Sequence, residues 1–346
     1  MSETERLPAS CVSASDPIGV LADRFEREDV PALIVRDDQG SVLGIAEAEA
    51  LRRACVRGQA EAKVETLLQE VPTVSEAEMD GAFPSFADPC GPAGLPVVDA
   101  EGTPVGLLVP RLPDEPLEAV IMAGGEGRRL RPQTESIPKP LLPIGGKPII
   151  HYIIAHLKKH GVTRFHLTLN YLREQFEQSL GDGRTLGVAI ETVVEPQKLG
   201  TAGAIGLLKD RLKSPFLVIN GDILTSLNVS ALRRYHLRRG LGITVATHPY
   251  HVEVPYGIMR QDEAGHVQGV DEKPTLHFEA NAGIYMMSPE VLQHIPAGRY
   301  CDMTEMIDAC PQRGLPVGSF PMIEYWTDIG KPEDFERARR ELHRLG

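Results

Sequence analysis

The sequence predicts an α/β protein in which a three-layer αβα sandwich, built on a mixed and mostly parallel sheet, follows a smaller α+β domain. From residue 118 onward, short apolar runs typical of strands alternate with longer amphipathic runs typical of helices. Before residue 110, a hairpin-like segment occurs twice. The charge also changes there: residues 1–110 hold 8 Lys and Arg against 20 Asp and Glu, and the remainder holds 28 of each. A chain of 346 residues can bury two cores, so we expect a boundary near residue 110.

The N-terminal repeat pairs ALIVRDDQGSVLGI (32–45) with GLPVVDAEGTPVGL (94–107), without gaps, at an offset of 62 residues. Each copy has a short apolar run, an acidic turn with glycine and a second apolar run, which predicts two β-hairpins. The first copy is flanked by runs typical of helices, whereas the turn-rich stretch between the copies predicts a shorter second unit.

This repeat resembles a tandem pair of CBS motifs, a family that often senses adenine nucleotides. The family holds its ligand with a Thr and an Asp, but here Glu47 and Val109 take the Thr position, and Ala50 and Leu112 take the Asp position. The resemblance therefore implies a CBS-like domain over 1–110 with degenerate ligand motifs. Two interpretations stay open: a structural or homo-oligomerisation module, and an effector site.

A proline-rich stretch predicts a short, stiff linker at 111–117, and residues 118–346 form the expected catalytic domain. Its leading strand–helix alternation predicts parallel strands covered by helices on both faces. Strands are expected at 118–123, 164–170, 188–195 and 216–222, and helices at 148–161, 171–181, 201–212 and 229–240. Strand-rich pieces at 242–248, 256–261, 266–273 and 281–288 predict an antiparallel region, and 334–345 predicts a closing amphipathic helix.

Composition excludes several classes of protein. No apolar run reaches the roughly 20 residues of a membrane span, and the acidic N-terminus is not that of a signal peptide. A net charge of −12 without a clustered basic excess argues against nucleic acid as a partner. Five widely spaced cysteines without a CxxC pair indicate reduced thiols, so we expect a cytoplasmic protein.

The stretch MAGGEGRRLRPQTESIPKPLLPIGGKP (122–148) has the composition of a linker, yet it lies between an expected strand and an expected helix. Glycines at the carboxyl end of a parallel strand let backbone N–H groups approach a phosphate. Two known phosphate loops are excluded. The dinucleotide fingerprint would need glycine where Leu130 stands, and a Walker A loop does not fit Leu141 and Pro148.

The complete pattern, GGxGxRLxPxT followed by PKPLLPIGGKPII, resembles the sugar-1-phosphate nucleotidyltransferases. Further motifs occur in that family's order and extend the resemblance over about residues 118–340: GTAGA (200–204), NGD (220–222), PYG (255–257), EKP (272–274), NAGIY (281–285) and YWTDIGKPEDF (325–335). With the CBS-like pair in front, the chain is most similar to guanylyltransferases that act on glucosamine 1-phosphate in legionaminic acid biosynthesis. Mannose-1-phosphate guanylyltransferase, and pyrophosphorylases that use UTP or dTTP with glucose 1-phosphate, are the alternatives.

The reaction that the resemblance implies is an in-line attack of a sugar 1-phosphate on the α-phosphorus of a nucleoside triphosphate, here GTP, with release of pyrophosphate. The nucleophile is already anionic at neutral pH, because the second pKa of a phosphate monoester is about 6. The protein therefore needs no general base. It must position two polyanions and neutralise their charge with backbone N–H groups, cationic side chains and a divalent metal.

The resemblance also implies roles for individual residues. Arg129 and Lys139 would contact phosphates, and Asp222 and Asp328 would hold Mg²⁺, a metal that prefers oxygen ligands. Arg128 stands where relatives often have Ser or Thr. The implied nucleotide-binding residues are Ala123, Gly124, Gly125, Gly127, Gly200 and Thr201, and the implied sugar-phosphate-binding residues are Gly257, Glu272, Lys273 and Asn281.

Two alternatives of a different class remain at this point. A regulatory protein that binds nucleotide-sugars without turnover would have no need of the intact Arg129, Lys139, Asp222 and Asp328. A glycosyltransferase of related architecture usually carries a DxD metal motif after the nucleotide site, whereas this strand ends in NGDIL with a single aspartate. Release of pyrophosphate separates the three possibilities.

Overall fold

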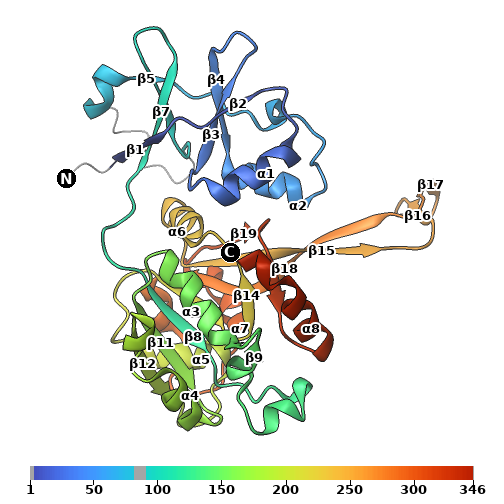
Figure 1. The fold of residues 1–346 in the computed structure, drawn as a ribbon. Coiled ribbons are helices and arrows are strands. Elements are labelled where there is room, and N and C mark those ends of the chain that lie inside the picture. Colours follow the sequence, from blue (N-terminus) through green and yellow to red (C-terminus); the bar gives the residue numbers. More distant parts are fainter. Residues whose placement is uncertain (1–3, 82–90, 346) are drawn as a thin grey trace.

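The structure is a computed structural model that describes residues 4–81 and 91–345. A smaller N-terminal domain sits on one end of a larger α/β domain, and a single extended segment connects them (Figure 1). In the N-terminal domain, one sheet has the order β1-β7-β6-β5 and the other the order β2-β3-β4. The elements of this domain are β1 (Thr4–Pro8), β2 (Cys11–Ser13), α1 (Ile18–Arg27), β3 (Ala32–Arg36), β4 (Val42–Glu47), α2 (Ala48–Val56), β5 (Val74–Ser75), β6 (Leu95–Val98) and β7 (Pro104–Pro110).

The structure confirms the repeat down to the register of the two hairpins. Both β3–β4 and β6–β7 are antiparallel, and the register shifts after Val35 in the first and after Val97 in the second, at the same offset of 62. Asp37 and Asp99 close the equivalent turns, since each side chain accepts hydrogen bonds from the backbone two and four residues further on. In the described part of the second copy there is no α-helix, and residues 82–90 of the stretch between the copies lie outside the described residues. The likeness to CBS motifs stays a prediction.

The connecting segment between β7 and β8 is fastened to the larger domain. Arg233 donates hydrogen bonds to the carbonyl oxygens of Pro113 and Glu115, and the Ser214 hydroxyl donates to the Glu115 carboxylate. Leu117 is buried in the core of the larger domain. The segment is therefore held at several points before β8 begins.

The larger domain contains a seven-stranded sheet in the order β12-β11-β8-β13-β18-β15-β19. The first four strands are parallel, β18 runs antiparallel to both of its neighbours, and β15 is parallel to β19. The expected mixed, mostly parallel sheet is thus confirmed. Its strands are β8 (Glu118–Met122), β11 (Arg164–Leu169), β12 (Ala189–Val194), β13 (Phe216–Asn220), β15 (Ile243–Glu253), β18 (Thr275–Met287) and β19 (Val317–Pro321).

Helices cover both faces of this sheet, which gives three layers. Successive residues of β8 alternate between two apolar cores: Ala119 and Ile121 contribute to one, and Val120 to the other. The first core is covered by α3 (Ile149–Lys159), α4 (Arg173–Leu180), α6 (Val229–Arg238) and α8 (Pro332–Glu341), and the second by α5 (Gly200–Ile205) and α7 (Met303–Ala309).

One helix is shorter than expected. The helix predicted over 201–212 is α-helical only over Gly200–Ile205, and a 3-10 turn, Gly206–Leu208, follows it. Gly203 and Gly206 lower the helix propensity of this stretch. Gly203 also lies against the Arg299 carbonyl, where an added Cβ would come within 2.9 Å of the oxygen. We attribute the shorter helix to these two glycines and to the close backbone contact at Gly203.

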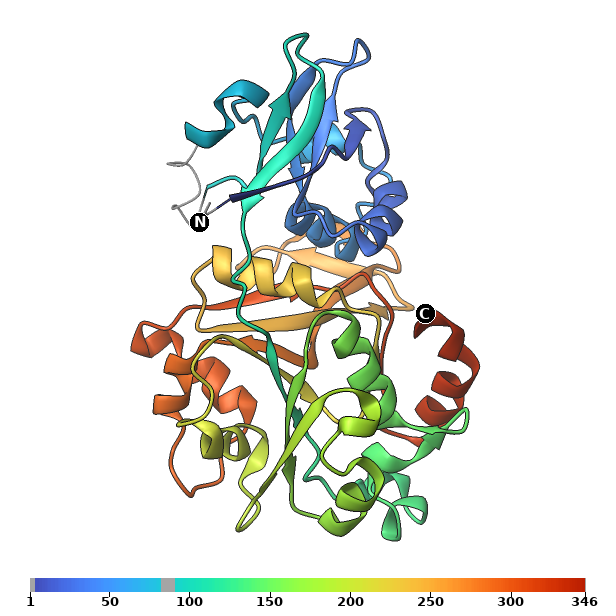
Figure 2. The same ribbon diagram turned by 60° about the vertical axis from the view of Figure 1, so that its left-hand side comes forward.

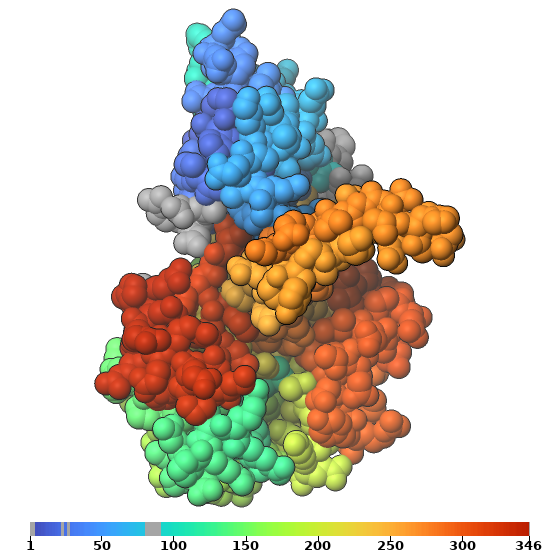
Figure 3. Space-filling model, turned by 90° about the vertical axis from the view of Figure 1, so that its right-hand side faces the viewer, coloured from blue at the N-terminus to red at the C-terminus, as the bar shows by residue number. Residues whose placement is uncertain are grey.

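Strands β15 and β18 continue beyond the sheet as a two-stranded arm, which carries β16 (Ile258–Gln261) and β17 (Val267–Asp271) at its tip (Figures 1 and 3). Many apolar side chains of the arm are exposed, among them Tyr250, Tyr256, Met259, Val267 and Phe278. Two further two-stranded antiparallel sheets belong to the domain: β9 (Pro143–Ile144) with β10 (Lys147–Pro148), and β14 (Ile223–Thr225) with β20 (Trp326–Asp328). Across the two described stretches, no helix is long and apolar enough to cross a membrane.

Candidate active site

The candidate site lies at the carboxyl ends of β8 and β13, where open parallel sheets bind ligands. These strands run away from the N-terminal domain, so the site is at the far end of the molecule (Figure 2). Figure 3 shows a hollow on this side, between the segment that follows β8, the region of α5 and the region of α7. Two adjoining cavities open here, of about 240 and 250 Å³, and both are lined by Met122, Gly125 and Asp222.

Of the three glycines in the loop after β8, Gly124 and Gly127 are tightly packed and Gly125 is not. Gly127 has a φ of +61°, and a Cβ there would lie 3.0 Å from a methyl carbon of Thr134, whose hydroxyl donates to the Gly127 carbonyl at 2.8 Å. A Cβ at Gly124 would collide with the Glu195 carboxylate, whereas a Cβ at Gly125 would meet nothing within 4 Å. The loop therefore presents its backbone to the cavities at Gly125.

Lys139 lies between two carboxylates at the centre of the site. It begins a 3-10 turn, Lys139–Leu141, and prolines on both sides fix the local backbone. Its side chain is only 9% exposed. The ammonium is paired with the carboxylate of Asp222 and lies 3.7 Å from Oδ1 of Asp328.

The two aspartates, 106 positions apart in the numbering, are brought together by a short strand pair. In the β14–β20 register Ile223 pairs with Asp328, and the Ile329 N–H donates to the Asp222 carbonyl at 3.1 Å. Burial and the neighbouring charge of Asp222 raise the pKa of Asp328, against the opposing effect of Lys139 and Arg129. Oδ1 of Asp328 is buried and accepts no hydrogen bond.

A divalent cation fits this arrangement. Two adjacent carboxylates, one with an unsatisfied buried oxygen, form the kind of donor set that Mg²⁺ takes when phosphate and water complete its coordination. Among residues 4–81 and 91–345, no group of three or more His, Cys, Asp or Glu side chains is arranged to hold a metal. Asp222 and Asp328 are therefore the described side chains that would hold a cation here.

The two arginines of the signature differ in their surroundings. Arg129 lines the first cavity with Lys139 and Asp222, and its guanidinium lies close to Gly330. Arg128, the residue that departs from the family pattern, is 70% exposed and makes a bidentate pair with Glu126 at 2.8 and 3.0 Å. Arg128 thus has its ion-pair partner, Glu126, within its own turn.

The second cavity is bounded by α5 and the segment before α7. The N-terminal N–H groups of α5 are already used by the protein: Thr201 donates to the Asp302 carboxylate at 3.2 Å, and Ala202 and Gly203 donate to the Cys301 carbonyl at 3.0 Å. A ligand here meets side chains rather than a free helix end. Those that line the cavity include Lys198, Thr201, Tyr300 and Asp302.

Two acidic residues of the second cavity were not among the predicted site residues. Glu195 follows β12, and its Oε2 accepts a hydrogen bond from the Leu199 N–H at 3.0 Å. Burial raises the pKa of Glu195, and one carboxylate oxygen faces Gly124. Its place after a parallel strand is the same signal that identified Asp222. Asp302 has no such signal, because it lies about 100 residues from the α5 backbone that it binds.

The structure brings most predicted nucleotide and metal residues together, but it leaves the predicted sugar residues apart. Ala123, Gly124, Gly125, Gly127, Arg129, Lys139, Gly200, Thr201 and Asp222 all line or border the two cavities, with Asp328 beside them. Gly257, Glu272 and Lys273 lie on the arm, exposed and outside both linings. Asn281, at the foot of the arm, accepts a hydrogen bond from the Gly283 N–H at 2.9 Å. The sugar-binding roles of these four residues stay predictions.

Comparison with known proteins identifies the family to which the larger domain belongs. The family model described as nucleotidyl transferase matches residues 118–344. The chain belongs to this nucleotidyl transferase family. It is 33% identical over 245 residues to a UTP–glucose-1-phosphate uridylyltransferase of Synechocystis, with 65% of this chain and 63% of the relative covered. It is 35% identical over 229 residues to a probable mannose-1-phosphate guanylyltransferase of rice, with 63% of each covered. The chain thus spans less than two thirds of either relative.

A similar solved structure adds a comparison of the fold. HddC from Yersinia pseudotuberculosis, complexed with GMP-PN, matches with a TM-score of 0.52 and 27% identity, and the match covers 65% of this chain and 99% of HddC. Coverage of nearly all of HddC by part of this chain is consistent with a nucleotidyl transferase domain that carries an additional domain at its N-terminus.

Proposed function

We propose that this protein transfers a nucleoside monophosphate from a nucleoside triphosphate to a sugar 1-phosphate, which yields a nucleotide-sugar and pyrophosphate. The observation that carries the proposal is the pair of cavities that share Asp222. Lys139 and Arg129 line one of these cavities, and Asp328 lies 3.7 Å from the Lys139 ammonium. Two cavities that meet at one carboxylate suit two phosphorylated substrates that must meet at one phosphorus. Membership of the nucleotidyl transferase family supports the same reaction.

In the proposed step, an oxygen of the sugar phosphate attacks the α-phosphorus, and the bond from that phosphorus to the oxygen bridging to the β-phosphorus breaks. Lys139 and Arg129 neutralise phosphate charge, and the backbone at Gly125 approaches the phosphates closely. Asp222 and Asp328 would hold Mg²⁺, which supplies further charge neutralisation when bound. The burial of Lys139 strengthens its effect, because little solvent screens its charge.

We propose GTP as the nucleotide, and Glu195 supports that choice. Guanine presents N1–H and N2–H₂ side by side, and an ionised carboxylate accepts hydrogen bonds from both. Uracil and thymine present a single N–H between two carbonyl oxygens, and a carboxylate would repel those two oxygens. For the sugar we propose glucosamine 1-phosphate, as in guanylyltransferases of legionaminic acid biosynthesis, on the order and spelling of the motifs. Mannose 1-phosphate is the second candidate, supported by the relative from rice.

The test is release of pyrophosphate over a grid of five nucleoside triphosphates and the 1-phosphates of glucosamine, mannose, glucose and N-acetylglucosamine, for the wild type and for Glu195→Gln. We expect Mg²⁺-dependent turnover by the wild type, fastest with GTP. In Glu195→Gln the preference for GTP over UTP should fall by about 10- to 100-fold, because an amide can also donate. Absence of pyrophosphate with every pair would contradict the proposed reaction. An unchanged base preference in the variant would contradict only the role of Glu195.

A further inference from the structure

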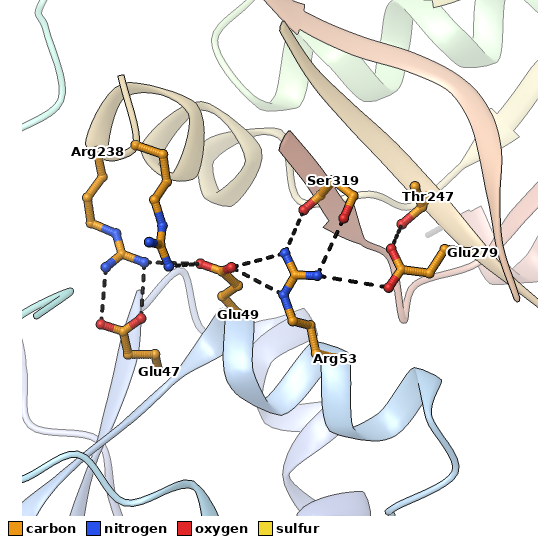
Figure 4. Close-up of polar contacts among 8 residues, drawn as sticks. Glu47, Glu49, Arg53, Arg238, Thr247, Glu279 and Ser319 are labelled. Carbon is orange, nitrogen blue, oxygen red and sulfur yellow. Dashed lines mark hydrogen bonds and ion pairs between the residues drawn. The ribbon is translucent and has the colours of Figure 1, made fainter. Parts of the chain in front are cut away.

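Helix α2 of the N-terminal domain lies against the catalytic domain, on the side of β19 and the foot of the arm (Figures 2 and 4). Its amino-terminal end is held by α6: Arg238 pairs with Glu47 at 3.1 Å and with Glu49 at 3.3 Å, and Arg239 pairs with Glu49 at 2.9 Å. Carboxylates from the acidic domain thus face arginines of its neighbour. This arrangement presents two consecutive arginines of α2, Arg52 and Arg53, to two different segments of the catalytic domain.

Arg52 forms a buried bidentate ion pair with Glu324. Both side chains are 1% exposed, and the two N–H···O distances are 2.6 and 2.7 Å. The guanidinium also lies 4.7 Å from the ring centroid of Phe320. Burial alone would raise the pKa of Glu324, but the charge and hydrogen bonds of Arg52 outweigh it and hold that pKa below its usual value. Glu324 is therefore a buried anion whose countercharge comes from the other domain.

Glu324 lies two residues before β20, at the end of the β14–β20 pair opposite to the two aspartates of the site. Its carboxylate accepts further hydrogen bonds from the Asn228 N–H at 3.3 Å and from the Ile323 N–H at 3.1 Å. The next residue, Tyr325, is bonded through its carbonyl to the Thr225 hydroxyl at 2.9 Å, and β20 then runs to Asp328. Arg52, Glu324 and the β14–β20 pair form one continuous set of contacts that ends at Asp328.

Arg53 connects the same helix to the arm. It donates to the Ser319 carbonyl at 3.1 Å and lies 3.9 Å from the carboxylate of Glu279 (Figure 4). Glu279 in turn accepts a hydrogen bond from the Thr247 hydroxyl at 2.9 Å, beside the irregularity in the β15–β18 register. Helix α2 therefore contacts Glu324, just before the strand that carries Asp328, and Glu279, where the arm leaves the sheet.

We propose that Arg52 is a positioning residue for Asp328, so that the N-terminal domain completes the support of the active site from outside the catalytic domain. This inference rests on the proposed function only in giving Asp328 its metal-binding role. A buried carboxylate that loses its partner must take up a proton or draw in water. Either change loosens the segment from Glu324 to Asp328 and separates the two aspartates that share a cation.

The test compares Arg52→Lys with Arg6→Lys. Arg6 is a matched control, because it pairs with Glu76 at 2.6 Å within the same domain but on its exposed surface. Lysine keeps the charge but lacks the planar fork that binds both carboxylate oxygens. Two measurements are made on the full chain: Mn²⁺ binding by electron paramagnetic resonance with GTP present, and hydrogen exchange of the amides of residues 322–329.

For Arg52→Lys we expect Mn²⁺ affinity to fall about tenfold, as for residues that orient metal ligands, with faster exchange over 322–329. Arg6→Lys should match the wild type in both measurements. Should Arg52→Lys fail to fold, the double variant Arg52→Met/Glu324→Leu replaces the pair with apolar side chains, a change that proteins commonly tolerate. The same loss of affinity is expected, because leucine cannot accept the hydrogen bonds that Glu324 receives from the Asn228 and Ile323 N–H groups.

Wild-type affinity and exchange in a folded Arg52 variant would overturn the proposal. Failure of both variants to fold would also overturn it, since the pair would then be required for the fold rather than for local positioning. A wild-type protein that binds Mn²⁺ with GTP but releases no pyrophosphate would contradict the proposed function, while the comparison of affinities would still test the role of Arg52.

Discussion

Lys139, Asp222 and Asp328 show how single residues set the chemistry of this site. The buried ammonium shields one aspartate from the other, and both come from the edges of packed strands that fix their positions. Asp328 nevertheless keeps a buried oxygen without a hydrogen bond and has a raised pKa. A charged group held in unfavourable surroundings is common where function, rather than stability, has determined the residue.

This leads to a prediction for Asp328→Asn. A carboxyl group whose pKa is raised on folding opposes folding once it is ionised. The cost is absent below the unfolded value of 3.8 and fully present above the folded pKa, so it is present at pH 7. The variant should therefore unfold at a slightly higher temperature, on the order of 2 °C, since the 39% exposure of Asp328 leaves the effect partly screened.

The same substitution should lower activity by about 100-fold or more, because a neutral amide is a poor ligand for Mg²⁺. The unfolding temperature is measured by circular dichroism, and the activity is measured with a pyrophosphate assay. Asp308→Asn, on the exposed face of α7, is the control and should change neither. A variant with full Mg²⁺-dependent turnover would exclude Asp328 as a metal ligand.

At the scale of secondary structure elements, His236 connects α6 to the central sheet. Its ring is 1% exposed, with Nδ1 at 2.8 Å from the Thr244 hydroxyl on β15 and Nε2 at 3.0 Å from the Ser288 hydroxyl just after β18. Burial lowers the pKa of His236 to about 4. The packing of α6 on the sheet therefore depends on a neutral imidazole.

Stability should fall as the pH drops through the histidine range. Because the unfolded chain takes up a proton near pH 6.5 and folded His236 only near pH 4, stability is fully present above pH 6.5 and is lost progressively down to about pH 4. Between pH 7 and pH 5 this residue should cost roughly 2 kcal/mol of unfolding free energy. Urea unfolding at the two pH values measures the loss of unfolding free energy. This loss should be about 2 kcal/mol smaller in His236→Gln than in the wild type.

The exposed His343→Gln is the matched control for this prediction and should keep the wild-type pH dependence. An equal loss of stability in the wild type and in His236→Gln would show that His236 does not connect pH to the packing of α6.

At the scale of the whole molecule, the two domains have separate cores. Both cores of the catalytic domain begin after residue 116, and a third is made mainly by α1, α2, β3 and β4 of the N-terminal domain. The described residues at the interface between the domains instead form many ion pairs, and among these pairs Arg52–Glu324 has the least exposed side chains. Such an interface aligns two separately folded bodies.

Removal of residues 1–110 should therefore leave a folded domain with reduced activity. Its cores remain intact, and Glu324 becomes hydrated instead of staying buried without a partner. As for Arg52→Lys, we expect a lower affinity for Mg²⁺, with turnover lowered about tenfold, measured as pyrophosphate release by the truncated and full-length proteins. A folded truncation with no activity at all would contradict the view of the N-terminal domain as a support, and so would an unfolded one.

How far the sequence could predict the site depends on how local each signal is. Asp222, Glu195 and the glycine loop each follow a parallel strand, so the alternation of strands and helices is enough to place them at the carboxyl ends of the sheet. Asp302 and the Arg52–Glu324 pair join segments about 100 and 272 positions apart, and no pattern along the chain relates them. The residues predicted to bind the sugar phosphate are a third case, because Gly257, Glu272 and Lys273 lie on the arm, outside the linings of both cavities.

The alternation of strands and helices, the hairpin repeat and the glycine loop could be predicted from the sequence, because each depends on periodicity or on backbone freedom within a few residues. Three other features follow from the folding of distant segments onto one another. Lys139 lies between two aspartates, the N-terminal N–H groups of α5 bind Asp302 and Cys301, and an arginine of the N-terminal domain neutralises Glu324. Buried charge requires a partner, but the partner can come from any part of the chain that the fold brings near.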